Sequence, residues 1–303
     1  MIVIAFLLIV FSALLFSGII NKVKSVTAGR KGPSYFQPVF DIIRLFKKHS
    51  IYSTTTSYIF RLAPLVYFAT IFTALLFIPF FRNKGLFSFE GDFVVFAYLI
   101  GLGRFMMIIA AMDTGSGFEG MGANREALFS LLVEPAFFIL LGSLALVTDQ
   151  ISFYSLFNNI HFNSGLSIVI IIIITYVLIQ IAMVENSRIP VDDPKTHLEL
   201  TMIHEVMVLD YCGFDLALIQ LTNLLKFSVF GALIANFVIP LSTPLLFQIT
   251  GFLAVEIIFA VIVGMLESFR ARNKMNKNPQ WIISLSAIAI LVFLAVLILI
   301  NKI

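Results

Sequence analysis

Four charged side chains lie inside long apolar stretches of this sequence, where an isolated charge is unfavourable. They are Arg104, Glu134, Lys226 and Glu256. Insertion scales put an ionisable residue at the centre of a bilayer at roughly 2.5–3.5 kcal/mol, so such residues usually face an interior path and pair with one another. A structural ion pair that joins two helices would explain any one of them. The set as a whole favours proton conduction, because carboxylates and a lysine in a low-dielectric interior can exchange protons.

A second group of carboxylates lies in the link of residues 185–213. Glu199 and Asp210 are separated by about three helical turns, so on a helix they would share a face. The residues after Pro194 are helix formers, and a partly buried helical link with inward-facing carboxylates is expected; a solvated loop is the alternative. The acids of this link are Glu185, Asp192, Asp193, Glu199, Glu205 and Asp210.

The elements that must position these charges are long and apolar. The chain has 303 residues, of which 60% are hydrophobic and 12% charged, and its mean hydropathy is +1.02. A soluble domain would carry roughly 25% charged residues. Blocks of about twenty apolar residues match a hydrocarbon core of about 30 Å, and only helices or closed barrels satisfy their backbone there. We therefore predict an all-α, polytopic membrane protein, a single transmembrane domain over residues 1–303 with about eight spans. The expected spans are 2–20, 59–80, 93–112, 124–147, 165–184, 214–238, 245–266 and 281–301.

The basic residues are distributed unevenly between the links. Fifteen of the twenty lie in the first, third, fifth and seventh links, three lie in the even links and the termini, and two lie within spans. The positive-inside rule then places the odd links in the cytoplasm and both termini outside it. The fifteen are Lys22, Lys24, Arg30, Lys31, Arg44, Lys47, Lys48, Arg61, Arg125, Arg188, Lys195, Arg270, Arg272, Lys274 and Lys277.

The cytoplasmic links differ in length and character. They are expected at about 21–58, 113–123, 185–213 and 267–280. In the first link, residues 36–48 read FQPVFDIIRLFKK, and Phe36, Phe40 and Ile43 recur near helical spacing. This pattern predicts an amphipathic helix at the membrane interface.

Several kinds of site are disfavoured. Cys212 is the only cysteine, so the chain can form no internal disulfide and cannot hold a cysteine-ligated iron–sulfur cluster. Residues 115–120, GSGFEG, match the dinucleotide fingerprint, but they follow a membrane helix rather than a strand, so a tight turn between the third and fourth spans is expected. The net charge of +3 arises from clustered basic residues at the membrane, and no nucleic-acid partner is implied.

Three stretches resemble a known family of membrane subunits. They are GRKGPSYFQPVFDIIRLFKK, GLGRFMMIIAAMDTGSGFEGMGANRE and ENSRIPVDDPKTHLELTMIHEVMVLDYCG. The family is the one shared by respiratory complex I (subunit 1 and its bacterial counterparts) and the group 4 membrane-bound hydrogenases. The resemblance covers nearly the whole chain, and the third stretch is similar to the formate hydrogenlyase and hydrogenase-4 branch. The quinone-reducing branch typically reads closer to R-x-P-F-D-x-x-E-x-E-S-E-L, and the departures at Val191, Asp193 and Thr196 to Leu198 disfavour a quinone site.

The resemblance implies a role within a larger assembly. In this family the subunit joins a peripheral redox module to antiporter-like membrane subunits and is not a catalyst by itself. It holds no cofactor, and nickel–iron and iron–sulfur centres are expected in hydrogenase-like and iron–sulfur partner subunits. The implied location is the cytoplasmic membrane of a prokaryote.

The resemblance also assigns roles to residues of this sequence. Those implied or expected to dock the peripheral module are Arg30, Gly32, Pro33, Gln37, Pro38, Asp41, Arg44, Arg104, Asp113, Arg125, Glu126, Arg188, Asp192 and Asp193. The implied ion-translocation path consists of Glu134, Glu185, Asp192, Asp193, Glu199, Glu205, Asp210, Asp215, Lys226 and Glu256.

Two other functions stay open at this point. In one, the chain is the quinone-site subunit of a complex I, with the first and fifth links lining a quinone chamber. In the other, it is a free-standing secondary transporter, although no inverted repeat is found in the sequence.

Overall fold

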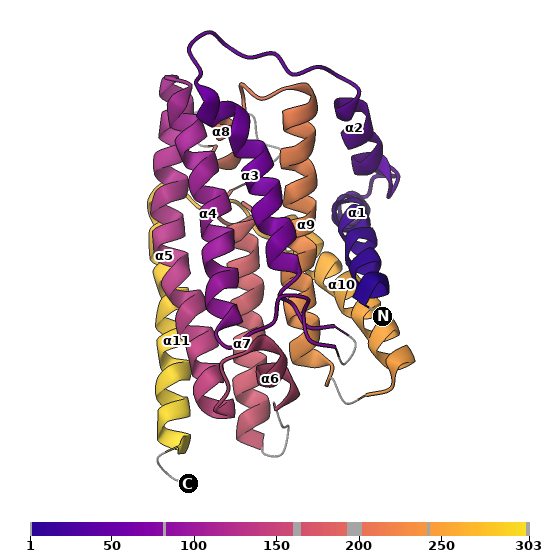
Figure 1. Cartoon of the computed structure of the whole chain (residues 1–303), viewed down its shortest axis with the longest axis vertical. Helices are drawn as coiled ribbons and strands as arrows, with labels where there is room; N and C mark the ends of the chain where they lie inside the picture. Colours follow the sequence, from indigo (N-terminus) through magenta and orange to yellow (C-terminus); the bar gives the residue numbers. More distant parts are fainter. Residues whose placement is uncertain (1, 81–82, 160–164, 193–201, 241–242, 301–303) are drawn as a thin grey trace.

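The computed structural model describes residues 2–80, 83–159, 165–192, 202–240 and 243–300 (Figure 1). Eight helices in this part of the chain are long and apolar enough to cross a membrane, which confirms the predicted all-α, eight-span architecture. They are α1 (Ile2–Thr27), α3 (Tyr58–Leu75), α4 (Asp92–Asp113), α5 (Gly117–Thr148), α7 (Gly165–Glu185), α9 (Gly213–Val238), α10 (Leu245–Phe269) and α11 (Asn278–Ile300). The shorter elements are α2 (Gln37–Phe46), α6 (Phe153–Asn158), α8 (His204–Met207) and the 3-10 turn η1 (Met275–Lys277).

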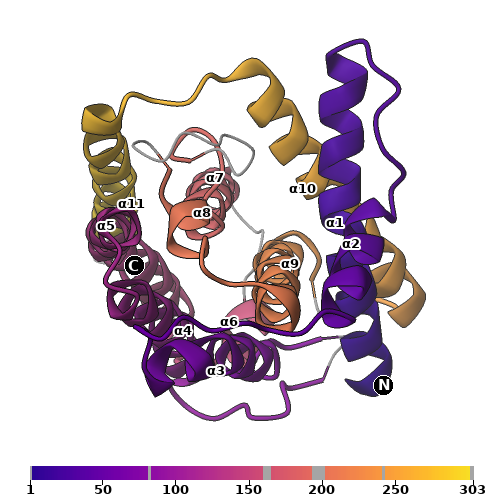
Figure 2. The ribbon, with the colours of Figure 1, turned by 90° about the horizontal axis from the view of Figure 1, so that it is seen from above.

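Helix α9 lies inside the bundle, with α7 and α8 beside it and the other long helices around them (Figure 2). It packs against α1, α3, α7 and α10. In its most apolar window 83% of the residues are buried, against at most 50% in any other span. Small and polar side chains such as Thr222, Ser228 and Gly231 suit this position, because they let helices approach closely and would be poorly placed against lipid.

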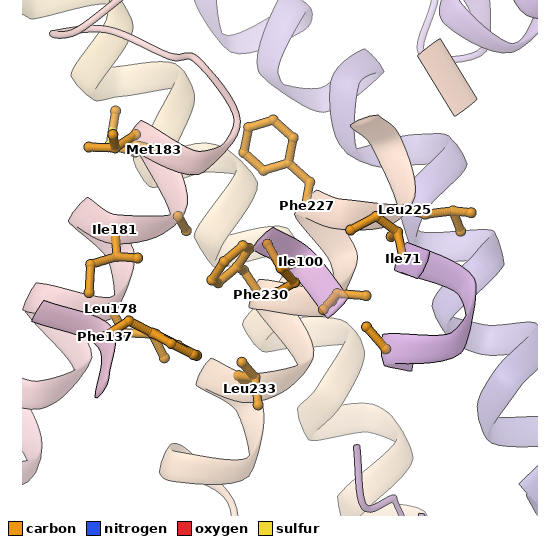
Figure 3. Packing of buried hydrophobic residues seen from close by; sticks show 14 of the residues in the cluster. Ile71, Ile100, Phe137, Leu178, Ile181, Met183, Leu225, Phe227, Phe230 and Leu233 are labelled. Atoms are coloured by element: carbon orange, nitrogen blue, oxygen red, sulfur yellow. The ribbon is translucent and has the colours of Figure 1, made fainter. Parts of the chain in front are cut away.

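Aliphatic and aromatic side chains fill the space between α9 and its neighbours. Phe230 and Leu233 of α9 lie between Ile100 of α4 and Phe137 of α5, with Ile181 of α7 nearby, and all are buried (Figure 3). Interiors of this kind are close-packed and transmit displacements. The polar side chains described below are therefore held by a rigid surround.

The odd-numbered links meet at one end of the bundle, which we term the α8 end; the opposite end is the far end. Hydrogen bonds join the first link to the third and the fifth, and the fifth link to the seventh. They run from the Ser57 amide to the Asp113 carboxylate (2.7 Å), from the Ser50 hydroxyl to the Cys212 carbonyl (3.3 Å) and from the Asn273 amide to the Pro190 carbonyl (3.0 Å). The links that carry most of the basic residues thus share one end.

The predicted amphipathic helix is present as α2. It spans Gln37–Phe46, within the expected residues 36–48. Ile42 is buried and faces the bundle, whereas Phe40 and Ile43 are about half exposed (52% and 45%). An exposed apolar face beside polar residues is typical of a helix lying at the membrane interface.

Several expected boundaries are wrong, and each error has a physical cause. Helix α1 continues to Thr27 rather than residue 20, because Lys24 is paired with Glu267 instead of facing lipid. Helix α5 begins at Gly117 rather than residue 124, since its polar first turns pack against the fifth link rather than lipid. Helix α3 ends at Leu75 rather than residue 80, four residues before Pro79, which disfavours a continuing helix.

The expected helical link after Pro194 lies partly within the described residues. Residues 193–201 lie outside the described residues, and the described remainder contains the four-residue helix α8 alone. The expected turn at GSGFEG is confirmed: α4 ends at Asp113, α5 begins at Gly117, and Gly115 between them adopts a φ of 72°. Glycine adopts this left-handed conformation without the strain a side chain would bring.

Candidate functional site

Four charged side chains from four helices meet inside the bundle. We term Arg104 of α4, Glu126 of α5, Glu185 of α7 and Lys226 of α9 the charge cluster. The Glu185 carboxylate is central: Arg104 forms an ion pair with it, and the Lys226 ammonium lies 2.9 Å from its Oε2 atom. The Arg104 Nε atom lies 3.8 Å from Glu126 Oε1. When ionised the two positive and two negative charges balance, so gaining or losing one proton would leave a charge uncompensated.

Burial makes this balance consequential. Lys226 is 2% exposed and Glu185 8%, and Lys226 also donates a hydrogen bond of 2.5 Å to the Glu185 backbone carbonyl. Attraction between charges is many times stronger in a protein interior than in water. A change in the charge of one member of the cluster therefore favours a compensating gain or loss of a proton at a neighbouring member.

Glu134 of α5 extends the cluster toward the outside of the bundle. It is exposed and lines a cavity of about 20 Å³ together with Arg104 and Glu185. A cavity of this size and polarity has room for a water molecule. Glu134 thus lies at the lateral edge of the charge cluster, on a span that would otherwise face lipid.

A larger cavity opens at the α8 end between α1, α2, α8 and α9. Its volume is about 300 Å³, and we term it the α8-end cavity. Twelve of its sixteen lining residues are polar or charged. They are Ser17, Asn21, Gln37, Asp41, Asn186, Ser187, Arg188, Asp192, His204, Glu205, Gln220 and Asn223. Such a lining suits water and ions better than a large apolar ligand, whose pockets are mostly hydrophobic.

Three neutral polar groups lead from this cavity toward α3. The Tyr67 hydroxyl donates to the Asn223 carbonyl oxygen at 2.8 Å, and the Asn223 amide nitrogen lies 3.1 Å from His204 Nε2. An amide nitrogen only donates, so His204 Nε2 accepts and the imidazole is neutral. Burial, together with the positive charges of Lys226 and Arg104, lowers the pKa of His204 to about 4, against an opposing contribution from Asp192.

The neutral state of His204 predicts that the α8 segment opens in acid. Folding lowers the pKa of His204 from 6.5 to about 4. The opened segment therefore binds more protons between these values, and its free energy of opening falls as the pH drops from about 6.5 toward 4. We expect amide hydrogen exchange of residues 202–212, corrected for intrinsic rates, to be faster at pH 5 than at pH 7.

His204→Gln should remove this pH dependence, because glutamine keeps an acceptor for Asn223 but does not titrate. His49→Gln, at an exposed histidine, serves as the control. Equal exchange at both pH values in the unsubstituted protein would contradict the assignment.

Two further buried carboxylates fasten the links of the α8 end. Glu267 of α10 binds Lys24 of α1 at 2.8 Å and Arg188 of the fifth link at 3.3 Å. Asp192 binds Arg272 of the seventh link at 2.9 Å and accepts hydrogen bonds from the backbone amides of residues 203 and 204, both at 3.1 Å. These pairs tie the fifth link to the helices that surround the cavity.

Comparison with known proteins shows the family to which the chain belongs. The family model described as NADH dehydrogenase matches residues 1–296. The chain belongs to this family. Among curated relatives, Hydrogenase-4 component C of Escherichia coli (strain K12) is 30% identical over 288 residues, covering 91% of this chain and 89% of the relative. Formate hydrogenlyase subunit 4 of the same organism is 25% identical over 274 residues, covering 88% of each chain.

A solved structure shares the fold. One chain in the structure of the membrane-bound sulfane sulfur reductase (MBS), described as an archaeal respiratory membrane complex, superposes with a TM-score of 0.81. The match covers 96% of this chain and 98% of that chain at 18% identity, so it concerns the fold alone. The resemblance to the hydrogenase branch inferred from sequence is thereby confirmed, and the protein is a multi-pass membrane member of the NADH dehydrogenase family.

The expected path residues of this family member do not form one row. Glu185, Lys226 and Glu134 gather at the charge cluster, while Glu205 and Asp192 line the α8-end cavity. The other expected members occupy separate places. Asp210 is exposed, Asp215 accepts a 2.7 Å hydrogen bond from Tyr52, Glu256 is buried between α1, α9 and α10, and Asp193 and Glu199 lie outside the described residues.

The expected docking residues also divide into two groups. Arg104, Glu126 and Asp192 are buried and bind partners within the chain, so the structure places them in the interior rather than on a docking surface. Others remain accessible at the α8 end. Arg30, Gly32, Pro33, Asp41 and Arg44 are exposed, and Gln37, Pro38, Asp113, Arg125 and Arg188 are half-buried, with Arg125 donating to the Met202 carbonyl at 2.9 Å.

Sequence reasoning missed several residues of the site. Arg272 was recognised only as a basic residue of a link, and Glu267 had no signal beyond its position at the end of a span. Tyr67 and Asn223 could have been noticed, because Asn223 lies one turn from Lys226 on α9. A polar residue one turn from a membrane-embedded charge is a usable sign that both face the same interior path.

Proposed function

We propose that this chain is the ion-translocating adapter subunit of a multisubunit, membrane-bound, hydrogenase-type oxidoreductase. In this proposal it links a peripheral redox module at the α8 end to antiporter-like membrane subunits beside α5. The carrying observation is the buried charge cluster. One small cavity places it beside Ser187 and Asp192, which also line the α8-end cavity, and another places it beside Glu134 of α5. The names of the two curated relatives, components of hydrogenase-4 and formate hydrogenlyase, support the choice of complex.

The coupling follows from charge balance. A small cavity of about 10 Å³ places Asp192 and Ser187 of the fifth link beside Arg104, Glu126 and Glu185. Moving the fifth link or changing its charge would alter the field at the charge cluster, and a proton would then be gained or lost. Redox chemistry in a docked partner can act on ions in this way without any redox group in this chain.

Glu134 marks where the charge change would leave the subunit. An exposed carboxyl on a membrane span is unfavourable against lipid. A neighbouring membrane subunit with polar groups of its own would cover it. This supports antiporter-like partners on the α5 side, in the plane of the membrane.

The docking surface for the peripheral module would include the exposed face of α2. The side chains of Asp41 and Arg44 are 50% and 73% exposed. The Arg44 guanidinium lies 3.7 Å from Asp41 Oδ1, so this surface ion pair is long and both groups can also bind a partner. We expect the double reversal Asp41→Lys and Arg44→Glu to release the peripheral subunits in mild detergent. The measurement is the subunit composition of the purified complex.

The matched control is the charge reversal Lys277→Glu. Lys277 is an exposed residue of the seventh link and does not belong to the expected docking residues. Retention of all peripheral subunits with both α2 charges reversed would count against α2 as a docking element. Nickel–iron and iron–sulfur centres belong, in this proposal, to the partners.

The proposed orientation has the α8 end in the cytoplasm and both termini outside it. The motive is the fifteen-to-three asymmetry of basic residues. In a Cys212→Ser background, a cysteine at exposed Asn276 should react with an impermeant thiol reagent only from the cytoplasmic side, and one at exposed Glu90 only from the opposite side. The reverse pattern would invert the proposed topology.

The experiment that tests the function is the ratio of ions translocated to electrons transferred. It requires the intact complex in proteoliposomes and the variants Lys226→Met, Glu134→Gln and Glu205→Gln. Lowered ratios in assembled complexes would support the role, and three unchanged ratios would remove it. The α8-end cavity is built from the first and fifth links, as a quinone-site subunit would require, but its mainly polar lining disfavours a quinone tail.

A further inference from the structure

One buried carboxyl group lies apart from the charge cluster. Glu256, near the middle of α10, is 2% exposed. Its Oε1 atom accepts a hydrogen bond of 3.1 Å from Ser228 of α9, and its Oε2 atom has no hydrogen-bond partner among the described residues. An ionised carboxylate without a partner is strongly disfavoured in an apolar interior. Glu256 must therefore hold a cation, either a proton or a bound metal ion.

Oxygen atoms surround this carboxyl group. The Ser228 hydroxyl lies 2.7 Å from the Ser12 hydroxyl of α1, and the Ile9 carbonyl accepts from Ser12 at 2.9 Å and from Ser228 at 3.1 Å. Carboxylate, hydroxyl and carbonyl oxygens are ligands for hard cations. A serine hydroxyl both donates and accepts, so the same atoms can also relay a proton.

The backbone of α9 is shaped to admit the carboxyl group. A Cβ atom at Gly231 would lie 2.5 Å from Glu256 Oε2 and 2.7 Å from Oε1. Only glycine leaves this space. The basic side chains nearest along α1 and α9 are engaged elsewhere, Lys22 with the Lys31 carbonyl and Lys226 with Glu185.

Apolar side chains flank the site on both sides along α1. Toward the α8 end, Phe16 stacks on Phe227 at 4.9 Å and meets Phe259 at 5.2 Å, and Phe227 also lines the α8-end cavity. Toward the far end, a mainly apolar pocket of about 30 Å³ reaches Ile9. The order along α1 is therefore pocket, Ile9, Ser12, Phe16 and cavity. Apolar constrictions of this kind gate ion paths.

We infer that Glu256, Ser228, Ser12 and the Ile9 carbonyl form an occluded site for a monovalent cation, H⁺ or Na⁺. The site exchanges its cation with the α8-end cavity when the Phe16–Phe227–Phe259 barrier opens. This inference rests on the proposed ion-translocating function and adds a second cation-binding site to it, on the opposite side of α9 from the charge cluster. The competing explanation is a neutral carboxyl that only joins α9 to α10.

The deciding variant is Glu256→Gln, which keeps the shape and the hydrogen bond from Ser228 but cannot release a cation. The intact complex in proteoliposomes is driven by a reduced viologen dye, and ions are counted per electron. We expect electron transfer to continue with a loss of ions per electron. A ratio equal to that of the unsubstituted complex overturns the inference, because a merely structural carboxyl is replaced by an amide without effect on ion counts.

Lys226→Met in the same assay separates this inference from the proposed function. A lowered ratio in Lys226→Met with an unchanged ratio in Glu256→Gln removes only the second site. An unchanged ratio in Lys226→Met removes the role of the charge cluster, whatever Glu256→Gln does.

Ser228→Ala keeps the carboxyl and removes one oxygen, and Ser286→Ala, at a serine that bonds the Leu132 carbonyl, is its control. Ion counts are taken as ²²Na⁺ uptake and as internal pH, across a range of Na⁺ concentrations and of pH. A shift of half-saturation along the Na⁺ axis identifies Na⁺, and a shift along the pH axis alone identifies H⁺. No shift on either axis overturns the inference, and this arm decides the matter where Glu256→Gln does not assemble.

Discussion

Lys226→Met is expected to leave the complex assembled and able to transfer electrons while it uncouples ion movement. Methionine has a similar volume and fills the same space, and Glu185 keeps its ion pair with Arg104. The substitution removes one of the two positive charges that balance Glu126 and Glu185. One of these carboxyls should then hold a proton permanently, because the three remaining charges would otherwise leave one negative charge uncompensated in this interior. The charge cluster can then no longer gain or lose a proton when the charge of the fifth link changes.

The size of the effect follows from typical coupling energies. Coupling free energies between two sites are commonly about 1–3 kcal/mol, a factor of about 5 to 150 in the binding equilibrium. Without this coupling, electrons pass while few ions move, and we expect the ratio of ions to electrons to fall several-fold. Lys226→Arg, which keeps the charge, should retain most of the ratio, and Lys277→Met, at an exposed lysine, should retain all of it. A normal ratio in Lys226→Met, with stable assembly, would show that the cluster only joins helices.

Glu267→Gln is expected to act on stability instead of coupling. The Glu267 side chain is 0% exposed and holds Lys24 and Arg188, whose side chains are only 21% and 12% exposed. Removing one partner of a buried ion pair typically costs about 3–5 kcal/mol, since the remaining charges are left uncompensated. Here a single substitution leaves both Lys24 and Arg188 without their carboxylate partner. It also weakens the contacts that hold α1, α10 and the fifth link together.

The measurement is the thermal midpoint of the detergent-solubilised complex, followed by the ion-to-electron ratio of the fraction that stays assembled. We expect a clear loss of stability and an unchanged ratio in the survivors. Glu90→Gln, at an exposed carboxyl, should change stability by no more than about 0.5 kcal/mol. A lowered ratio at normal stability would move Glu267 into the ion path.

Taken together, the two variants distinguish two uses of buried charge in one chain. Glu185 is shared by two cations and adjoins cavities of about 20 and 10 Å³, so its environment can change. Glu267 holds its two cations at the junction of α1, α10 and the fifth link, and its contacts fasten elements together. The first arrangement favours coupling and the second favours assembly.

The sequence by itself determined the class of the protein, its eight spans and the amphipathic α2, because hydrophobic length and periodicity are local properties of a chain. It also identified Glu134, Lys226 and Glu185 as charges in or beside spans, since a charge in an apolar block is visible without any partner. The resemblance of residues 185–213 to the hydrogenase branch likewise needed only the order of residues, and the relatives bear it out.

Only the tertiary structure decided how those charges are connected. Arg104 belongs with Glu185, Glu267 with Lys24 and Asp192 with Arg272, and each pair joins elements far apart in the sequence. The family resemblance placed Arg104 on a docking surface and had Glu256 extend the acidic path, and the position of Asp192 in the fifth link placed it on the docking surface as well. Rotation about each helix axis, set by how side chains pack against α9, turns a charge toward lipid, a cavity or another helix. That rotation depends on contacts summed over the whole bundle, and no local pattern in the sequence contains it.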